Sequence, residues 1–204
     1  MSMEFSEVIK ARRSIRKFKL FPVSDACVQE LLEAGRLAPS GLNMQPWRYI
    51  VIKSQAVRKR IIEATPSTFA INAPVLIVCC GDMQVFQTCQ IRISELHNVG
   101  AFLGTYFQDF SAEDFFSRTD TDESAVKAYL ALNVAISIEH INLKAVDLGL
   151  GSCWIGAFDS NEVKKIVEID DRYDIIALLA IGYADQTPSP RPRLPIQDLL
   201  LKVL

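Results

Sequence analysis

Residues 123–148 constrain the fold more than any other segment, because they contain neither glycine nor proline and repeat apolar residues at helical spacing. Val126 and Leu130 lie on one side of the predicted helix, and Leu132 lies on another. A helix that is apolar nearly all round has to be surrounded by protein. We therefore expect this helix to form part of the core, with some of its cover coming from a second copy of the chain.

Helices and strands alternate along the remaining sequence, which predicts an α+β protein. A helix is expected to begin after Ser24, a favourable N-cap residue, and to end before Pro39. The run "PVLIVCC" is continuously apolar, as in a strand that is buried on both faces. Strands are predicted over 49–53, 74–80, 152–156 and 174–184, and helices over 4–12, 54–64, 161–167 and parts of 84–117. No linker divides the sequence, so residues 1–204 are predicted to form one domain.

The last twenty residues have a composition of their own. Residues 188–195 include four prolines, and leucines dominate from 199 onward. Prolines favour extended chain, whereas the leucines need a surface that buries them. We expect the tail, residues 185–204, to wrap around a partner subunit.

Cysteine, histidine and hydropathy patterns exclude several classes of protein. The five cysteines form no CxxC pair, and the two histidines belong to no spaced set of ligands, so no metal site is predicted. The N-terminus lacks the apolar core of a signal peptide, and every apolar run is far shorter than the roughly 20 residues of a membrane span. These features indicate a cytoplasmic protein with no membrane partner.

Positive charge is concentrated near the N-terminus. Residues 1–60 carry twelve Lys/Arg and five Asp/Glu, although the whole chain has a formal net charge of −2. The segment "RRSIR" places Arg12, Arg13, Ser14 and Arg16 close together at the end of a predicted helix. Guanidinium groups and a hydroxyl suit a phosphate monoester, because arginine binds phosphate oxygens through two donors. A solvated basic patch is the alternative from the charge alone.

A second polar segment lies between a predicted helix and a predicted strand. In "APSGLNMQPW", Pro39, Gly41 and Pro46 restrict the backbone. The same loop holds uncharged hydrogen-bonding side chains at Ser40, Asn43 and Gln45. Such groups can match the donors and acceptors of a heteroaromatic ring edge, as in a flavin.

Known nucleotide-binding fingerprints do not fit. A G-x-G-x-x-G motif that begins at Gly149 would need glycine where the chain has Trp154. A P-loop that begins at Gly151 would need Lys and Ser or Thr at Ala157 and Phe158. Both fingerprints fail. Since the sequence also shows no hydrolytic or metal-binding motif, the difficult chemistry of an enzyme with this sequence would belong to a cofactor.

Four segments in this order resemble the FMN-dependent nitroreductase family: "RRSIRKF", "LAPSGLNMQPW", "GLGSCWIGAF" and "RPRLPIQDLL". The resemblance covers residues 12–200. It implies a three-layer α+β sandwich with a central mixed sheet flanked by helices. It also implies a homodimer whose core is the long helix and whose C-terminal tails extend onto the partner.

The resemblance further implies which residues contact FMN. Arg12, Arg13 and Ser14 would hold the phosphate and ribityl chain, completed by Arg191 and Arg193, and Arg16 would lie near the N1–C2=O edge. The loop Pro39, Ser40, Gly41, Asn43 and Gln45 would line the flavin, with Ser40, Gly41 and Asn43 coming from the other subunit. The backbone of Ile155, Gly156 and Ala157 would approach N5 and O4.

The implied activity is hydride transfer from NADH or NADPH through FMN to nitroaromatics, quinones or related small acceptors in a ping-pong cycle. Because the flavin supplies the hydride chemistry, no catalytic protein base is predicted, and Arg16 would act as an electrostatic stabiliser. Reductive dehalogenation or modification of the flavin itself on the same fold is an alternative. A remote alternative is a nonenzymatic module that binds anions through the basic N-terminus, although the local charge does not favour nucleic acid.

Substrate choice is expected to depend on residues 107–124. Phe110, Phe115 and Phe116 lie there among six acidic side chains and one arginine. These aromatic rings could stack on a flat acceptor as a lid. An amphipathic connector with a solvated acidic face is the equal alternative.

Overall fold

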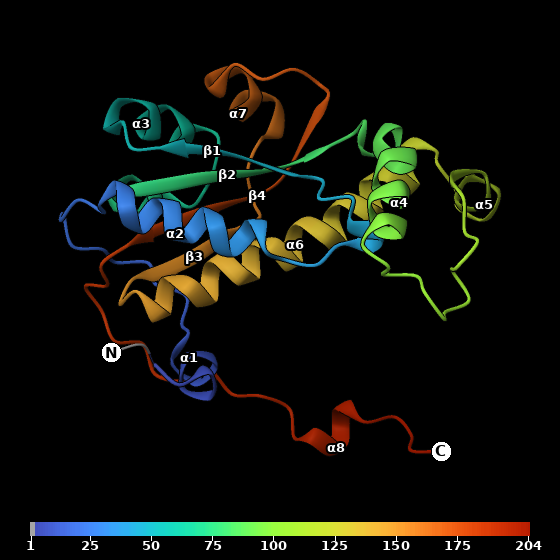
Figure 1. Ribbon diagram of the computed structural model, residues 1–204. Coiled ribbons are helices and arrows are strands. Elements are labelled where there is room, and N and C mark those ends of the chain that lie inside the picture. Colours follow the sequence, from blue (N-terminus) through green and yellow to red (C-terminus); the bar gives the residue numbers. More distant parts are fainter. Residues whose placement is uncertain (1–2) are drawn as a thin grey trace.

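A computed structural model describes residues 3–204. The predicted long helix is α6, Glu123–Asp147, which is 25 residues and therefore about 37 Å long. The side chain of Asp122 caps its first turn by accepting from the backbone N–H of Ala125. Gly149, with φ of 71°, follows its end in the left-handed conformation that glycine favours. Figure 1 shows α6 crossing beneath the sheet.

Four strands form the sheet in the order β1 (Trp47–Ile52), β2 (Val75–Asp82), β4 (Tyr173–Gly182) and β3 (Gly151–Ile155). All eight residues of β2 are buried, which confirms the prediction from its apolar run. Every strand ladder among the described residues is antiparallel, so the expectation of a mixed sheet is wrong for this chain. The reason is visible in the first connection, which leaves the sheet at Ile52 and returns beside it, where Ile52 pairs with Leu76.

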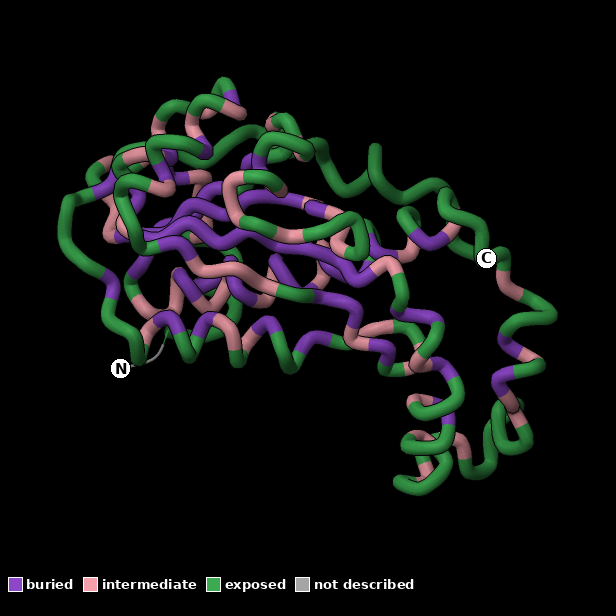
Figure 2. Tube along the Cα trace, turned by 90° about the horizontal axis from the view of Figure 1, so that it is seen from above, coloured by how far each residue is buried: buried purple, intermediate pink, exposed green. Residues whose placement is uncertain are grey.

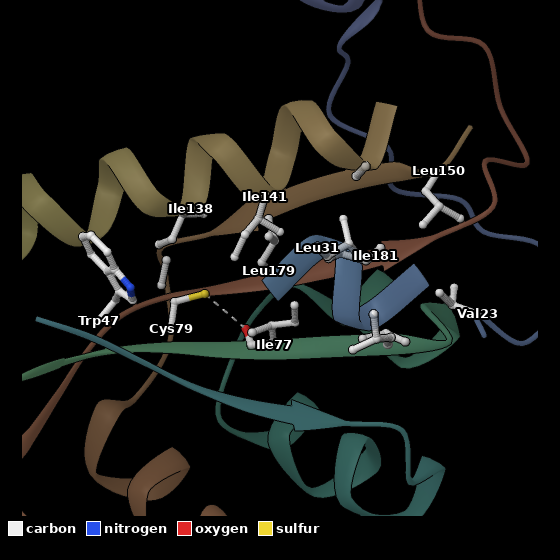
Figure 3. Packing of buried hydrophobic residues seen from close by; sticks show 14 of the residues in the cluster. Val23, Leu31, Trp47, Ile77, Cys79, Ile138, Ile141, Leu150, Leu179 and Ile181 are labelled. Atoms are coloured by element: carbon white, nitrogen blue, oxygen red, sulfur yellow. Dashed lines mark hydrogen bonds between the residues drawn. The ribbon is translucent and has the colours of Figure 1, made fainter. Parts of the chain in front are cut away.

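Helices cover both faces of the sheet and give three layers (Figure 1). On one face lie α6 and α2 (Asp25–Arg36), and on the other lie α3 (Gln55–Glu63) and α7 (Ser160–Val167). Figure 3 shows Leu31 of α2 and Ile138 and Ile141 of α6 packed against the strands. These three side chains are fully buried, so α6 is fixed on the side that faces the sheet.

A small helical lobe projects from one end of the sheet (Figures 1 and 2). It contains η3 (Val85–Thr88), α4 (Cys89–Asn98) and α5 (Ala112–Arg118), with an irregular segment between the two α-helices, as the sequence predicts. A third apolar cluster joins this lobe to the N-terminal half of α6 through Val126 and Leu130. The short helices η1 (Gly41–Asn43) and η2 (Thr68–Asn72) complete the connections.

Both ends of the described chain run along the same side of the molecule. Helix α1 (Phe5–Ala11) lies below the sheet in Figure 1, and the tail passes beside it before the short helix α8 (Ile196–Leu199). The apolar tail residues from Leu194 to Leu204 are each at least 56% exposed. Across residues 3–204, no helix combines the length and apolar character that a membrane crossing requires.

Candidate functional site

A cavity of about 580 Å³ lies where the N-terminal segment meets the tail. Its walls bring together residues from the two ends of the sequence, and six of the ten lining side chains are Lys or Arg. No acidic residue of the described chain lines it. We call this space the arginine cavity; it is lined by Ile9, Lys10, Arg12, Arg13, Ser14, Arg16, Pro188, Pro190, Arg191 and Arg193.

Backbone pairing to the sheet holds the basic segment in place. Ser14 forms a parallel bridge with Ser152 of β3, and the N–H of Ile15 donates to the carbonyl of Ser152 at 2.9 Å. Farther along, Phe18 bridges to Ala184, two residues after the end of β4. The side chains of Ile15 and Phe18 are buried in the apolar cluster that the sheet shares with α3 and α7, whereas Arg16 between them is exposed.

Arg13 shows that this cavity suits an anion. One of its terminal nitrogens donates to the carbonyls of Lys10 and Arg12, at 2.6 and 2.8 Å. Its Nε atom is buried and has no hydrogen-bond partner among the residues that the structure describes. A buried donor without a partner is costly unless a ligand accepts from it. A phosphate beside six cations would provide such an acceptor, so the residues present fit the phosphate of FMN.

The loop 39–45 has an unusual backbone. Leu42, Asn43 and Gln45 all have positive φ angles, between 49° and 53°. Left-handed backbone is unfavourable for residues with a Cβ atom and persists only where other contacts enforce it. The hydroxyl of Ser40 supplies one such contact by accepting from the N–H of Gln45 at 2.9 Å.

Two residues of α6 fix the loop from outside. Asn133 is 3% exposed and accepts from the N–H of Gly41 at 3.0 Å, while its own amide donates to the carbonyl of Tyr129 at 2.8 Å. The hydroxyl of Tyr129 donates to the carbonyl of Gly41 at 2.8 Å. Gly41 is therefore held through both its N–H and its carbonyl. Burial raises the pKa of Tyr129, which keeps this hydroxyl protonated as a donor.

Neither Tyr129 nor Asn133 was predicted from the sequence. A usable signal was present, because Asn133 is an amide directly beside the apolar residues Val134 and Leu130 of the buried stripe. A buried amide in such a stripe needs hydrogen-bond partners outside the helix ladder. Which partner it contacts depends on the packing of α6 against a loop some 90 residues away, and the sequence pattern does not give that packing.

The segment Ile155, Gly156 and Ala157 lies at the end of β3. Ile155 is buried, Gly156 and Ala157 are exposed, and the carbonyl of Ala157 accepts from the hydroxyl of Thr65 at 2.6 Å. An added Cβ at Gly156 would meet no atom within 4 Å, so the backbone there is open to a ligand. Ile155 is three positions after Ser152 along the strand, which places this segment about 10 Å from the basic segment.

The arginine cavity and the loop 39–45 do not meet within one chain. None of the loop residues lines the cavity. Both regions contact α6, but Gly41 does so at Tyr129 and Asn133, whereas Arg12 lies 4.0 Å from Glu139. Six residues of helix, or about 9 Å, separate Asn133 from Glu139.

The three aromatic residues of the predicted lid have different surroundings. Phe115 is 9% exposed and packs edge-on against Phe86, so its ring belongs to the core of the lobe. Phe110 is half-buried beside Phe107, and Phe116 is 47% exposed. Of the three, Phe116 presents the most surface to a stacking ligand.

Comparison with known proteins identifies the family. The model of the family described as "Nitroreductase family" matches residues 9–183. The chain belongs to the nitroreductase family. An FMN reductase (NAD(P)H) of Bacillus subtilis is 30% identical over 93% of this chain and 71% of its own length.

Solved structures of the nitroreductase family agree with this fold. A nitroreductase family protein of Streptococcus pneumoniae superposes with a TM-score of 0.79 at 30% identity, covering 98% of this chain and 100% of that one. A protein of Exiguobacterium sibiricum solved in complex with FMN gives a TM-score of 0.83 at 25% identity, with 98% and 97% covered. The family and the α+β fold predicted from the sequence are thereby confirmed.

Proposed function

We propose that this protein is an FMN-dependent oxidoreductase that uses NADH or NADPH to reduce nitroaromatics, quinones or related small acceptors. The observation that carries the proposal is the arginine cavity, where cationic side chains from both ends of a nitroreductase-family chain converge without an acidic lining residue. FMN, when bound, supplies a ring that accepts a hydride and passes electrons on. The chain's own residues bind and orient that group.

Each part of the site has a proposed task. Arg12, Arg13 and Ser14, with Arg191 and Arg193, bind the phosphate, because that is the charged end of the cofactor and these are the cations around the cavity. Arg16 places positive charge where the flavin ring gains negative charge on reduction. The backbone at Gly156 leaves room for the ring to approach.

We further propose that the working form is a homodimer. The loop Pro39, Ser40, Gly41, Asn43 and Gln45 lies away from the arginine cavity of its own chain, so a complete site needs the loop of a second copy. Leu132, 65% exposed in the middle of α6, and the exposed tail offer apolar surface for that contact. Phe110 and Phe116 of the lobe would then contact the acceptor.

The test begins with the visible absorption spectrum of the purified protein and identification of any chromophore released on denaturation. We expect a yellow protein that releases FMN, near one per chain. NAD(P)H oxidation is then followed with a nitroaromatic and with a quinone, and steady turnover with either supports the proposal. Flavin consumption during turnover, or reaction only with halogenated acceptors, would favour the alternative chemistries. A colourless protein that also fails to bind added FMN would overturn it.

A further inference from the structure

A series of polar side-chain contacts links β3 to the arginine cavity through α6. The hydroxyl of Ser152 donates to the side-chain oxygen of Asn142, and the Asn142 amide donates to Oε2 of Glu139 at 2.9 Å. The other oxygen, Oε1 of Glu139, lies 4.0 Å from Nε of Arg12. Ser152 and Asn142 are 1% and 2% exposed, so the first two members are buried in the protein interior.

Both ends of this series of contacts reach the same basic segment. Ser152 accepts through its backbone carbonyl from the N–H of Ile15, three residues beyond Arg12. Its side chain begins the series that ends at the guanidinium of Arg12. The backbone after Arg12 is thus tied to β3, and its side chain is tied to α6. These two contacts, one through the backbone and one through the carboxylate of Glu139, restrict where this guanidinium can point.

Glu139 approaches Arg12 in a way that leaves the arginine usable. The contact involves Nε at 4.0 Å, beyond hydrogen-bond distance, and the guanidinium has four further N–H groups. The side chain of Arg12 is 25% exposed and lines the arginine cavity. A carboxylate that is 45% exposed would ordinarily rotate, but the amide of Asn142 holds one of its oxygens.

We propose that Glu139 and Asn142 are positioning residues that orient Arg12 toward the phosphate of the bound flavin. This rests on the proposed function and names a role for residues outside the cofactor-binding set. Fixing a flexible arginine before binding removes part of the entropy cost of ordering it in the complex. In the opposite role, the carboxylate would only neutralise Arg12 and compete with the phosphate. Its removal would then tighten FMN binding instead of weakening it.

The experiment compares FMN with riboflavin, which lacks the phosphate. Flavin release is followed by fluorescence on dilution of the loaded protein, for the wild type and for Glu139→Gln. We expect the Kd for FMN to rise about five- to tenfold in the variant. The Kd for riboflavin should not change. The control is Glu123→Gln, which removes an exposed carboxylate of α6 that pairs with Lys127. This variant should bind both flavins like the wild type.

Coupling to Arg12 separates positioning from a general structural effect. Glu139→Gln is repeated in an Arg12→Gln background, where it should no longer change FMN binding. Asn142→Ala should reproduce the loss for FMN with riboflavin binding retained. Unchanged or tighter FMN binding in Glu139→Gln would overturn the positioning role, as would equal weakening of riboflavin or a persistent effect without Arg12. A wild type that binds no FMN would overturn the proposed function as well.

Discussion

The arginine cavity and the loop 39–45 are both supported by α6, yet they are built in opposite ways. The cavity is lined by Lys10, Arg12, Arg13, Arg16, Arg191 and Arg193, most of which are exposed. The loop carries no charge, and its backbone is fixed at Gly41 by Asn133 and Tyr129. Charge attraction acts over several ångströms, because it weakens gradually with distance. Hydrogen bonds to a ring edge, the role proposed for the loop, need a fixed geometry, and the loop holds three residues at positive φ angles.

A second difference concerns the chain that each region serves. The basic segment is paired with β3 of its own chain, so all the cations proposed to bind the phosphate converge within one copy. The loop, between α2 and β1, is held against the N-terminal half of α6 by Tyr129 and Asn133, and none of its residues lines the arginine cavity. If the homodimer is correct, breaking it should remove the loop from the site and leave the arginines in place.

The largest expected effect comes from Leu132→Asp. Placing a charge at an apolar position of a subunit interface should cause dissociation, because burying an unpaired carboxylate is strongly unfavourable. We expect a monomer by sedimentation velocity and a loss of FMN affinity of about a hundredfold or more. Leu20→Asp is the matched control, since Leu20 is 83% exposed on another part of the surface, and it should remain dimeric. A Leu132→Asp protein with the mass and affinity of the wild type would contradict the proposed interface.

Arg13→Gln tests the charged region alone. Loss of a charge-assisted hydrogen bond of about 1.5–3 kcal/mol should raise the Kd for FMN by roughly tenfold to a hundredfold. Riboflavin should bind as before, and the dependence of FMN affinity on salt should become weaker. Calorimetric titrations at two ionic strengths would measure both effects. Arg60→Gln, an exposed arginine of α3, should leave them unchanged, and a loss of riboflavin affinity in Arg13→Gln would argue against a phosphate contact.

Sequence patterns predicted most of this fold, because the strongest local signals agree with the packing. The absence of glycine and proline in α6, the apolar run of β2 and the cap at Ser24 all correspond to observed elements. The convergence of Arg12 with Arg191 was implied by family resemblance rather than by spacing. The prediction of a mixed sheet was wrong, because the direction of a strand depends on the end of the sheet to which each connection returns.

The supporting residues of the site were beyond such patterns. Asn133 and Asn142 lie nine residues apart on α6, and each contacts a different segment through long-range packing. A buried amide in the sequence pattern indicates that a hydrogen-bond partner is needed, but it does not indicate which residue is that partner. The cofactor-binding residues are easier to propose from motifs than the residues that hold them in place.

Asn133→Ala tests the loop region. The substitution leaves the N–H of Gly41 without its acceptor and should lower the free energy of unfolding by about 1–3 kcal/mol. Because the loop is proposed to contact the ring and not the phosphate, FMN and riboflavin should lose affinity by the same factor. Urea unfolding at fixed protein concentration measures the first effect and flavin titrations the second. Asn161→Ala, at the exposed start of α7, is the control, and selective weakening of FMN alone would show that the two regions are not separable.

Tyr129→Phe should have the smallest effect. It removes a single neutral hydrogen bond to the carbonyl of Gly41, a loss of about 0.5–1.5 kcal/mol at neutral pH. Burial raises the pKa of Tyr129 above its ordinary value of 10.0, so in alkali the unfolded state releases this proton while the folded state keeps it. The wild type should therefore lose stability as the pH rises through 10.0, whereas the variant lacks that contribution. Urea unfolding at neutral pH and at about pH 11 should show the difference between the two proteins shrinking at the higher pH. A difference that stays constant or grows would mean that this hydroxyl is not held in the buried contact that fixes the loop.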